Sequence, residues 1–244
     1  MIKLGSNSIG KIYLGSNSIG KAYLGSNLVF QKGSGPYPSG LTFVDYIETD
    51  GVAYINTGIK GNAPMSSKIF LIPVVLASGN SYFFGCRKDS GNTRFSFCMF
   101  TSDKKATFAY GSGIMSNGLD ISSSVDNGTL VGIQTRFQVG SQILYKKEAG
   151  ESSYTNSGYE SQENIQTDRD IFVFCINDQG DPGTPIAGLK IEHVMIYSDY
   201  DWTNLVLDLK ACYYNGEYGM WDTVSDTFFG NAAGSGAFTG PSIQ

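Results

Sequence analysis

The sequence predicts an all-β protein whose main part is a two-sheet antiparallel sandwich. Glycine is abundant at 31 residues, aromatic residues reach 13%, and charged residues make up only 16%. Aromatic residues favour strands and glycine favours tight turns, whereas most helices depend on charged residues that are scarce here. No window of about eleven residues carries the apolar stripe of an amphipathic helix. A short repetitive β-segment is predicted to precede this sandwich.

That segment is a ten-residue unit written nearly three times. Leu4–Tyr13 and Leu14–Tyr23 differ only in having Ile12 in one and Ala22 in the other, and a third copy begins at Leu24. Such a short exact period indicates a repeat architecture. Each unit predicts a strand over Ser-Ile-Gly-Lys-Ile/Ala-Tyr-Leu and a turn at Gly-Ser-Asn.

Residues 1–31 are too few to bury their own apolar side chains. Chains below about 40 residues usually need a disulfide, a metal or a partner to fold, and this stretch has no cysteine or histidine. We therefore expect an assembly segment, covered by other copies or by another protein. In a homotrimer, the residues that would meet around the axis are Ile12, Leu14, Ala22 and Leu24. The alternative is a weakly β-forming tail.

Residues 32–40 are rich in glycine, serine and proline and predict a linker, which leaves residues 41–244 as one domain. Pro73 predicts a bulge or an edge, and residues 148–168 predict a long surface excursion. The number of short strands is typical of a sandwich. Strands are expected over residues 43–48, 52–57, 68–76, 81–86, 94–100, 106–111, 131–137, 142–146, 170–176, 188–197 and 205–213.

Cysteine usage and charge limit the classes of function. Four cysteines lie far apart in apolar segments, which favours buried free thiols over disulfides or zinc ligands; they are Cys86, Cys98, Cys175 and Cys212. The net charge of −5 argues against a nucleic-acid partner. No apolar run of about 18 residues predicts a membrane span. The start lacks the pattern of a secretory signal, so we expect synthesis in a cytoplasm.

The segment 213–238 carries the most distinctive motif. In chain order its key residues are Gly219, Asp222, Phe228, Phe229, Asn231, Gly234, Gly236 and Phe238. This motif resembles the closing segment of concanavalin A-like (laminin G-like) jelly-roll domains of gut bacteria and their tailed phages. Residues 46–58 and 188–197 fit the same family. The resemblance implies a jelly roll over residues 41–240. The N-terminal repeat resembles leader segments of virion proteins from phages that infect gut Bacteroidetes.

A physical account of this motif concerns folding. We expect Asp222 to accept hydrogen bonds from the turn at residues 223–226. Phe228, Phe229 and Phe238 are large enough to close one end of a sandwich. Gly234 and Gly236 are expected to let the chain pass close to a sheet.

The sequence offers no convincing catalyst. Glucan-cleaving relatives of this fold resemble one another in a Glu-x-Asp-x-x-Glu or Glu-x-Asp-x-Glu strand motif. Retaining glycosidases need two carboxyl groups about 5 Å apart. Glu48-Thr49-Asp50 is the nearest match, but no second glutamate follows. His193, the single histidine, alternates with Ile191 and Met195, which predicts a packed or edge position. We predict no enzyme and no catalytic residue.

Two acidic turns could supply oxygen ligands to calcium. One holds Asp178 and Asp181, and the other holds Asp199, Asp201 and Asn204. Neither has the spacing of a calcium-binding loop, so solvated turns are expected instead and no metal or cofactor is predicted.

Two functions from different classes remain. The first is a non-enzymatic virion protein of the head-fibre, decoration or tail-fibre type. Its repeat would attach to capsid or tail proteins, and its jelly roll would bind cell-surface or mucosal glycans. Aromatic faces and polar partners form sugar sites, and the candidates here are Tyr82, Arg94 and Tyr110, with ordinary packing as the alternative for the tyrosines. The second is a bacterial carbohydrate-binding module or glycan-active enzyme of the laminin G-like superfamily.

Overall fold

The structure is a computed structural model of residues 1–244. It describes residues 3–4, 7–8, 12–14, 17–19, 21–24, 27–31, 37–76, 79, 81–88, 94–111, 113–114, 118–159 and 166–243. For residues 3–31, 94–97, 110, 113–114 and 159 in these ranges, the description covers the backbone alone. The chain divides into two compact units, Met1–Leu41 and Thr42–Gln244.

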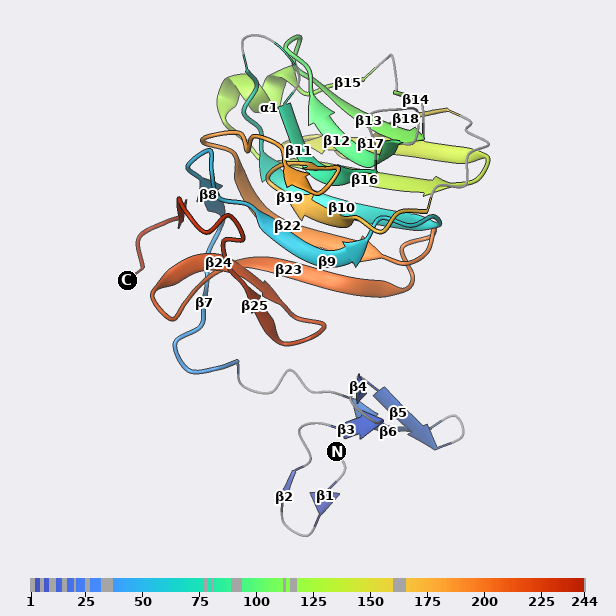
Figure 1. The fold of residues 1–244 in the computed structure, drawn as a ribbon, viewed down its shortest axis with the longest axis vertical. Helices are drawn as coiled ribbons and strands as arrows, with labels where there is room; N and C mark the ends of the chain where they lie inside the picture. Colours follow the sequence, from blue (N-terminus) through green and yellow to red (C-terminus); the bar gives the residue numbers. More distant parts are fainter. Residues whose placement is uncertain are drawn as a thin grey trace. The chain divides into compact units, whose positions relative to one another are not determined.

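The first unit contains three short antiparallel hairpins (Figure 1). Their pairing beside the loop is equivalent, because Leu4 faces Asn7, Leu14 faces Asn17 and Leu24 faces Asn27. The third hairpin then shifts register between Ala22 and Tyr23. In each hairpin the two sequence positions between the strands hold Gly-Ser, and glycine suits two-residue hairpin loops. The paired strands are β1 (Lys3–Leu4) with β2 (Asn7–Ser8), β3 (Ile12–Leu14) with β4 (Asn17–Ile19), and β5 (Lys21–Leu24) with β6 (Asn27–Gln31).

The repeat therefore differs in one respect from its sequence-based prediction. The sequence of the second decapeptide predicts one strand over residues 18–24. In the structure β4 ends at Ile19 and β5 begins at Lys21. The side chains of the four predicted assembly residues lie outside the described part, so their role stays a prediction; these residues are Ile12, Leu14, Ala22 and Leu24.

The second unit is a sandwich of two β-sheets, which confirms the predicted all-β jelly-roll class. The larger sheet has eleven strands, and eight of them form its main path. In spatial order these are β18 (Thr155–Tyr159), β17 (Ser141–Glu148), β16 (Val131–Gln138), β10 (Met65–Ile72), β22 (Lys190–Tyr197), β23 (Leu205–Tyr214), β24 (Glu217–Asp222) and β25 (Thr227–Phe229). Along its sides lie β7 (Thr42–Phe43), β8 (Ile47–Thr49) and β26 (Phe238–Thr239).

The smaller sheet has nine strands among the described residues. Its main path is β14 (Gly113–Ile114), β13 (Lys105–Gly111), β12 (Arg94–Phe100), β11 (Ser81–Arg87), β19 (Asp170–Val173) and β9 (Ile55–Lys60). It also includes β15 (Leu119–Asp120), β20 (Asn177–Asp178) and β21 (Asp181–Pro182). The pairing of β20 with β11 is parallel, in contrast to the antiparallel pairings along the main path.

Local departures from the predicted strands have identifiable causes. β8 and β9 belong to different sheets, so residues 50–54 form a corner between the two sheets. β10 ends at Ile72, one residue before Pro73, and its pairing with β22 shifts register between Phe70 and Leu71. The polar stretch predicted as a surface excursion contains β18, which pairs with β17.

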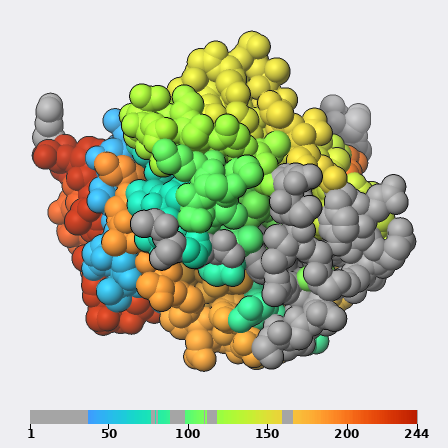
Figure 2. Space-filling model, turned by 90° about the horizontal axis from the view of Figure 1, so that it is seen from above, coloured from blue at the N-terminus to red at the C-terminus, as the bar shows by residue number. Residues whose placement is uncertain are grey.

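One short helix, α1 (Ser122–Asn127), was not predicted. Its six residues are too few for a helical stripe to be recognised. The backbone N–H of Ser124 donates a hydrogen bond of 2.5 Å to the buried carboxylate of Glu148 on β17. The surface around α1 and β16–β18 is the green-to-yellow region of Figure 2. No helix of the described chain is long and apolar enough to cross a membrane.

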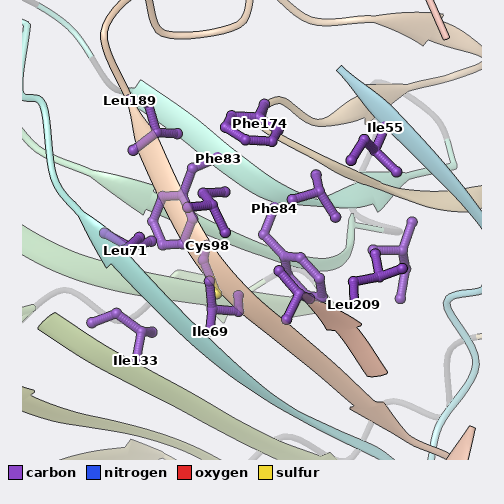
Figure 3. Packing of buried hydrophobic residues seen from close by; sticks show 14 of the residues in the cluster. Ile55, Ile69, Leu71, Phe83, Phe84, Cys98, Ile133, Phe174, Leu189 and Leu209 are labelled. Atoms are coloured by element: carbon purple, nitrogen blue, oxygen red, sulfur yellow. The ribbon is translucent and has the colours of Figure 1, made fainter. Parts of the chain in front are cut away.

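The core forms where the two sheets face each other. Figure 3 shows Ile69 and Leu71 of β10 pointing toward Phe83 and Phe84 of β11, and all four are at most 1% exposed. Alternation puts Ile69 and Leu71 on one face of β10. Phe83 and Phe84 are consecutive, and both reach the core where the pairing of β11 with β12 shifts register between Tyr82 and Phe84. Burying one such side chain contributes about 1.5–3 kcal/mol. The core therefore stabilises the second unit through contacts within that unit.

The four cysteines are free and buried, as predicted. Burial raises the pKa of the Cys175 and Cys212 thiols to about 12, and it also raises the pKa values of Cys86 and Cys98. The thiols therefore stay protonated at neutral pH and pack as small apolar groups.

The closing motif folds largely as expected around Asp222, which is 2% exposed. Its carboxylate accepts hydrogen bonds from the backbone N–H groups of Val224 (3.1 Å) and Ser225 (2.9 Å) and from the Ser225 hydroxyl (2.5 Å). It also accepts one from the Asp208 N–H on β23, at 2.9 Å. One carboxylate thus holds the turn and joins it to the neighbouring strand.

The aromatic residues of the motif divide between two environments. Phe238 is buried in the core, with its ring centre 4.9 Å from that of Phe174. Phe229 is partly buried against the same core. Phe228 instead lies 5.6 Å from Tyr214, outside the core cluster. The expectation that all three phenylalanines close the sandwich is thus met by only two of them.

The two glycines of the motif also differ. At Gly236 a Cβ atom would come within 2.6 Å of the Asp50 carboxylate and 2.7 Å of Val52, so the close approach is real. At Gly234 a Cβ would meet nothing within 4 Å, so the expectation of a close approach is wrong there. Its φ of +70° explains the glycine instead, because L-residues rarely adopt that conformation.

Replacing Asp222 with alanine should destabilise the fold. The substitution removes a buried charged acceptor and leaves four donors without it, which should cost about 2–3 kcal/mol. Urea unfolding followed by tryptophan fluorescence measures this loss. Asp168→Ala, at an exposed position with one loose ion pair of 3.7 Å, is the matched control and should change little. Equal effects of the two substitutions would contradict the structural role of Asp222.

Candidate functional site

The three predicted glycan-binding residues lie on adjacent strands of the smaller sheet. Tyr82 is on β11, Arg94 begins β12, and Tyr110 is on β13. The side chains of Arg94 and Tyr110 lie outside the described part of the structure. The backbone register is nevertheless informative, because Arg94 pairs with Gly111, the residue after Tyr110.

Tyr82 lies at a different position along the sheet. It pairs with Met99, which is five residues beyond Arg94 on β12. At a rise of about 3.3 Å per residue, this separation is roughly 17 Å along the strand. The backbone thus brings Arg94 and Tyr110 close together and puts Tyr82 well away from both. A shared site for all three remains a prediction about their side chains.

Tyr82 lines a cavity of about 600 Å³. We call this the end cavity, and its lining comes from four places in the chain: the corner after β8, the approach to β11, the start of β11, and the segment 176–187. The lining residues are Asp50, Gly51, Leu76, Ser81, Tyr82, Ile176, Asp178, Gly183, Thr184, Pro185, Ile186 and Ala187. Its volume falls in the range of small-molecule sites.

The ring of Tyr82 is half-buried and well supported. It packs against a small apolar cluster of Met99, Ala109 and Ile176, separate from the main core. Ser81, the preceding residue on β11, is buried, and its hydroxyl oxygen accepts a long hydrogen bond of 3.4 Å from the backbone N–H of Leu76. The aromatic wall of the end cavity is therefore held by a strand and by packing behind the ring.

Asp50 also lines the end cavity and is held as an anion. Its carboxylate accepts hydrogen bonds from the backbone N–H groups of Ala53 (2.9 Å), Ala237 (2.8 Å) and Val52 (2.8 Å). These bonds, with that of Ala53 the strongest, hold the pKa of Asp50 below its ordinary value of 3.8. A carboxyl group of this kind is a poor general acid.

The remaining acidic candidates are also engaged in structural contacts. Glu48 lies 3.6 Å from the Lys190 ammonium. Both oxygens of Asp178 accept from the Arg87 guanidinium, with the Nε contact at 2.7 Å. His193 Nε2 lies 2.5 Å from Asp208, and its ring stacks on Phe70. This histidine is half-buried on the outer side of β22, in keeping with the predicted packed or edge position.

The second acidic turn uses its carboxylates in the same way. Asp199 accepts hydrogen bonds from the backbone N–H groups of Asp201 (3.0 Å), Thr203 (3.0 Å) and Asn204 (2.5 Å). Asp201 forms an ion pair with Arg136. In the described part of the chain, no group of three or more His, Cys, Asp or Glu residues is placed to hold a metal ion.

Sequence reasoning missed a residue that links this end of the fold to the chain terminus. The side-chain oxygen of Asn231 accepts from the N–H of Tyr54 at 3.3 Å, and its amide nitrogen donates to the carbonyls of Ser235 (2.8 Å) and Gly236 (3.1 Å). The closing motif includes Asn231, but the motif does not indicate that its partner is Tyr54. A contact across 177 residues leaves no local signal in the sequence.

Comparisons with known proteins give fold-level likeness alone. No family model matches the chain, and no curated protein matches it in sequence. Among solved structures, the chain is similar to the CBM40 of the Ruminococcus gnavus IT-sialidase, at 12% identity and a TM-score of 0.47 over 66% of this chain and 92% of the other.

Two further solved structures resemble the chain over part of their own length. One is tailspike protein 2 of the Escherichia coli O157:H7 bacteriophage CAB120, at 13% identity and a TM-score of 0.42, covering 67% of this chain and 28% of the tailspike. The other is the leech intramolecular trans-sialidase, at 9% identity and a TM-score of 0.38, covering 66% of this chain and 26% of the enzyme. At these values the comparisons assign the chain to no family.

Replacing Asp50 with asparagine should remove a pH-dependent contribution to stability. Because the folded pKa of Asp50 lies below its unfolded value, the charged form stabilises the fold above the ordinary value of 3.8. That stability is lost as the pH falls through the folded pKa. The wild type should therefore exceed Asp50→Asn in unfolding midpoint at pH 6, and the difference should vanish in strong acid. A constant difference across the acidic range would contradict this account.

Proposed function

We propose that the chain is a non-enzymatic glycan-binding protein whose jelly roll is displayed on a virus particle through the N-terminal hairpins. The observation that carries the glycan-binding part is the end cavity. It presents the supported ring of Tyr82 beside the oxygen-bearing side chains of Ser81, Thr184 and Asp50. Sugars combine C–H faces, which stack on aromatic rings, with hydroxyl groups, which need hydrogen-bond partners.

We propose no catalysis because the carboxylates at the end cavity, those of Asp50 and Asp178, are engaged in hydrogen bonds and an ion pair. General acid catalysis on a glycoside needs a carboxyl group with a raised pKa beside a second carboxylate. At the end cavity the pKa of Asp50 is lowered, and Asp178 is held by Arg87. Both groups fit hydrogen-bond acceptors for sugar hydroxyls better than they fit an acid–base pair.

The attachment part of the proposal comes from the hairpins. Three hairpins recur at a period of ten residues, with equivalent pairing beside each loop. A two-stranded hairpin is marginal on its own, so its edges and apolar faces favour additional partners. We infer a homotrimer through Ile12, Leu14, Ala22 and Leu24, docked on capsid or tail proteins. The protein would then be located in the virion.

Glycan binding at the end cavity is tested with a glycan array probed by the full chain. We expect a defined set of hits, and Tyr82→Ala should weaken them about fivefold or more through loss of ring stacking. Tyr82→Phe keeps the ring and should retain most of the binding, and urea unfolding of both variants controls for folding. An array without hits, or hits that Tyr82→Ala leaves unchanged, would overturn a sugar site at this cavity.

Assembly through the hairpins is tested by deleting residues 1–33. The sandwich has its own core and should stay folded, while light scattering should show the mass falling from three copies to one. An unchanged mass would remove the trimer. Attachment is tested by tracing the full chain and the deleted form through virus purification, where only the full chain should stay with particles. Finding the full chain free of particles would favour a bacterial carbohydrate-binding module instead.

A further inference from the structure

The outer face of the eleven-stranded sheet carries cations that rest on aromatic rings. On β10, Lys68 and Phe70 alternate with the buried Ile69 and Leu71, so their side chains point away from the core. The register then defines a row of outward residues across five strands. This row is Tyr145 on β17, Gln134 on β16, Lys68 on β10, Met195 on β22 and Asp208 on β23.

Within the described part of the chain, all cation–π contacts involve this face. The Lys68 ammonium lies 5.1 Å from the Trp202 ring and 5.4 Å from the Tyr197 ring. The Arg136 guanidinium lies 4.1 Å from the Tyr200 ring and 4.6 Å from the Trp202 ring. The others are Lys147 with Tyr154 at 5.9 Å and Lys190 with Tyr46 at 4.8 Å.

These cations differ in whether a carboxylate neutralises them. Arg136 pairs with Asp201, and Lys190 lies 3.6 Å from Glu48. Lys68 and Lys147 have no carboxylate oxygen within 4.0 Å among the described residues. The Lys147 ammonium is near enough to Glu151 to help lower the pKa of that carboxyl group, but the two form no direct ion pair. In a chain of net charge −5, the ammonium groups of Lys68 and Lys147 on one aromatic face are complementary to an anionic ligand.

Their spacing favours a ligand with more than one negative charge. Lys68 pairs across to β16, and β16 pairs to the strand of Lys147, so the two residues stand two strands apart. Strands lie about 4.8 Å apart, which separates the two columns by about 10 Å. A ligand whose charges repeat along a chain can span the two columns and contact both ammonium groups.

Trp202 is held over this face by a specific loop conformation. Its φ of +56° is uncommon for a bulky residue. The hydrogen bonds that Asp199 accepts from the N–H groups on either side, those of Asp201 and Thr203, maintain the loop. The indole ring then stands edge-on to Tyr145, with ring centres 5.5 Å apart. Positions of unusual backbone conformation often serve a binding function.

We propose that this face binds an acidic polysaccharide through Lys68, Lys147, Tyr145 and Trp202. The sugar rings pack on the partly exposed side chains of Tyr145 and Trp202, and the carboxylates of the uronic or other acidic sugars contact the two ammonium groups. Gln134, between Lys68 and Tyr145 in the row, supplies a hydrogen-bonding amide. This site is separate from the end cavity and does not depend on it.

The charge pattern favours an acidic glycan over nucleic acid. Asp201, Glu48 and Asp208 bound the positive strip on the same outer face. A densely charged phosphate backbone would meet these carboxylates as well as the lysines. Acidic polysaccharides also carry hydroxyl groups, which can donate hydrogen bonds to these carboxylates, whereas a DNA phosphate backbone offers no donor.

Calorimetric titration of the full chain with oligogalacturonate, and with neutral galactan oligosaccharides of equal length, tests the proposal. We expect oligogalacturonate to bind and the neutral chain to bind about tenfold more weakly or not at all. Raising the salt concentration from about 50 mM to about 500 mM should weaken the binding of oligogalacturonate and leave any binding of the neutral chain unchanged. Equal binding of both ligands would overturn the proposal.

Variants then assign the binding to this face. Lys68→Gln with Lys147→Gln should reduce oligogalacturonate affinity about tenfold, while Lys88→Gln, which removes an exposed charge from the end of β11, should leave it unchanged. Tyr82→Ala should also leave it unchanged, which separates this site from the end cavity. Thermal unfolding checks that each variant folds. An unchanged affinity of the double variant, or equal binding of oligothymidylate, would overturn the proposal.

Discussion

The corner at residues 50–54 is the constraint on which the rest of the sandwich depends. At this point the chain leaves the eleven-stranded sheet and enters the nine-stranded sheet. Its backbone donors are satisfied by Asp50 within the corner, while Asp50 also accepts from Ala237 near the other end of the chain. The carbonyl of Tyr54 accepts from Ala232 at 2.9 Å. The first and last parts of the sandwich thus stabilise each other, and the end cavity lies beside their junction.

Much of this architecture could be predicted because strands and turns carry local signals. The apolar pattern of residues 188–197 predicts β22 within two residues. The expected shared face of Ile191 and His193 is wrong, because a register shift puts Ile191 in the core and leaves His193 on the outer side. The apolar setting of each cysteine predicts a buried thiol. The turn-holding role of Asp222 could be predicted because two of its hydrogen-bond donors, Val224 and Ser225, lie within three residues of it. Two features could not be predicted. The helix α1 has only six residues, too few for a recognisable pattern. The hydrogen bond between Asn231 and Tyr54 joins residues far apart in the sequence.

The candidate sites were harder to predict for the same reason. Tyr82 was a candidate because of its residue type, but its cavity is completed by residues 183–187, a hundred positions later. The outer face of the larger sheet gave no sequence signal, since Tyr145, Lys68 and Trp202 meet only through the register of three strands and one loop. Composition can indicate a surface rich in tyrosine and lysine, whereas pairing decides which of these residues become neighbours.

The ten-residue period of the three N-terminal hairpins has a consequence for how this leader can vary. Each hairpin straddles the start of one decapeptide, with Leu4, Leu14 and Leu24 in equivalent places. Inserting or removing one decapeptide therefore adds or removes one whole hairpin. The leader can lengthen or shorten in fixed increments without any new fold having to evolve.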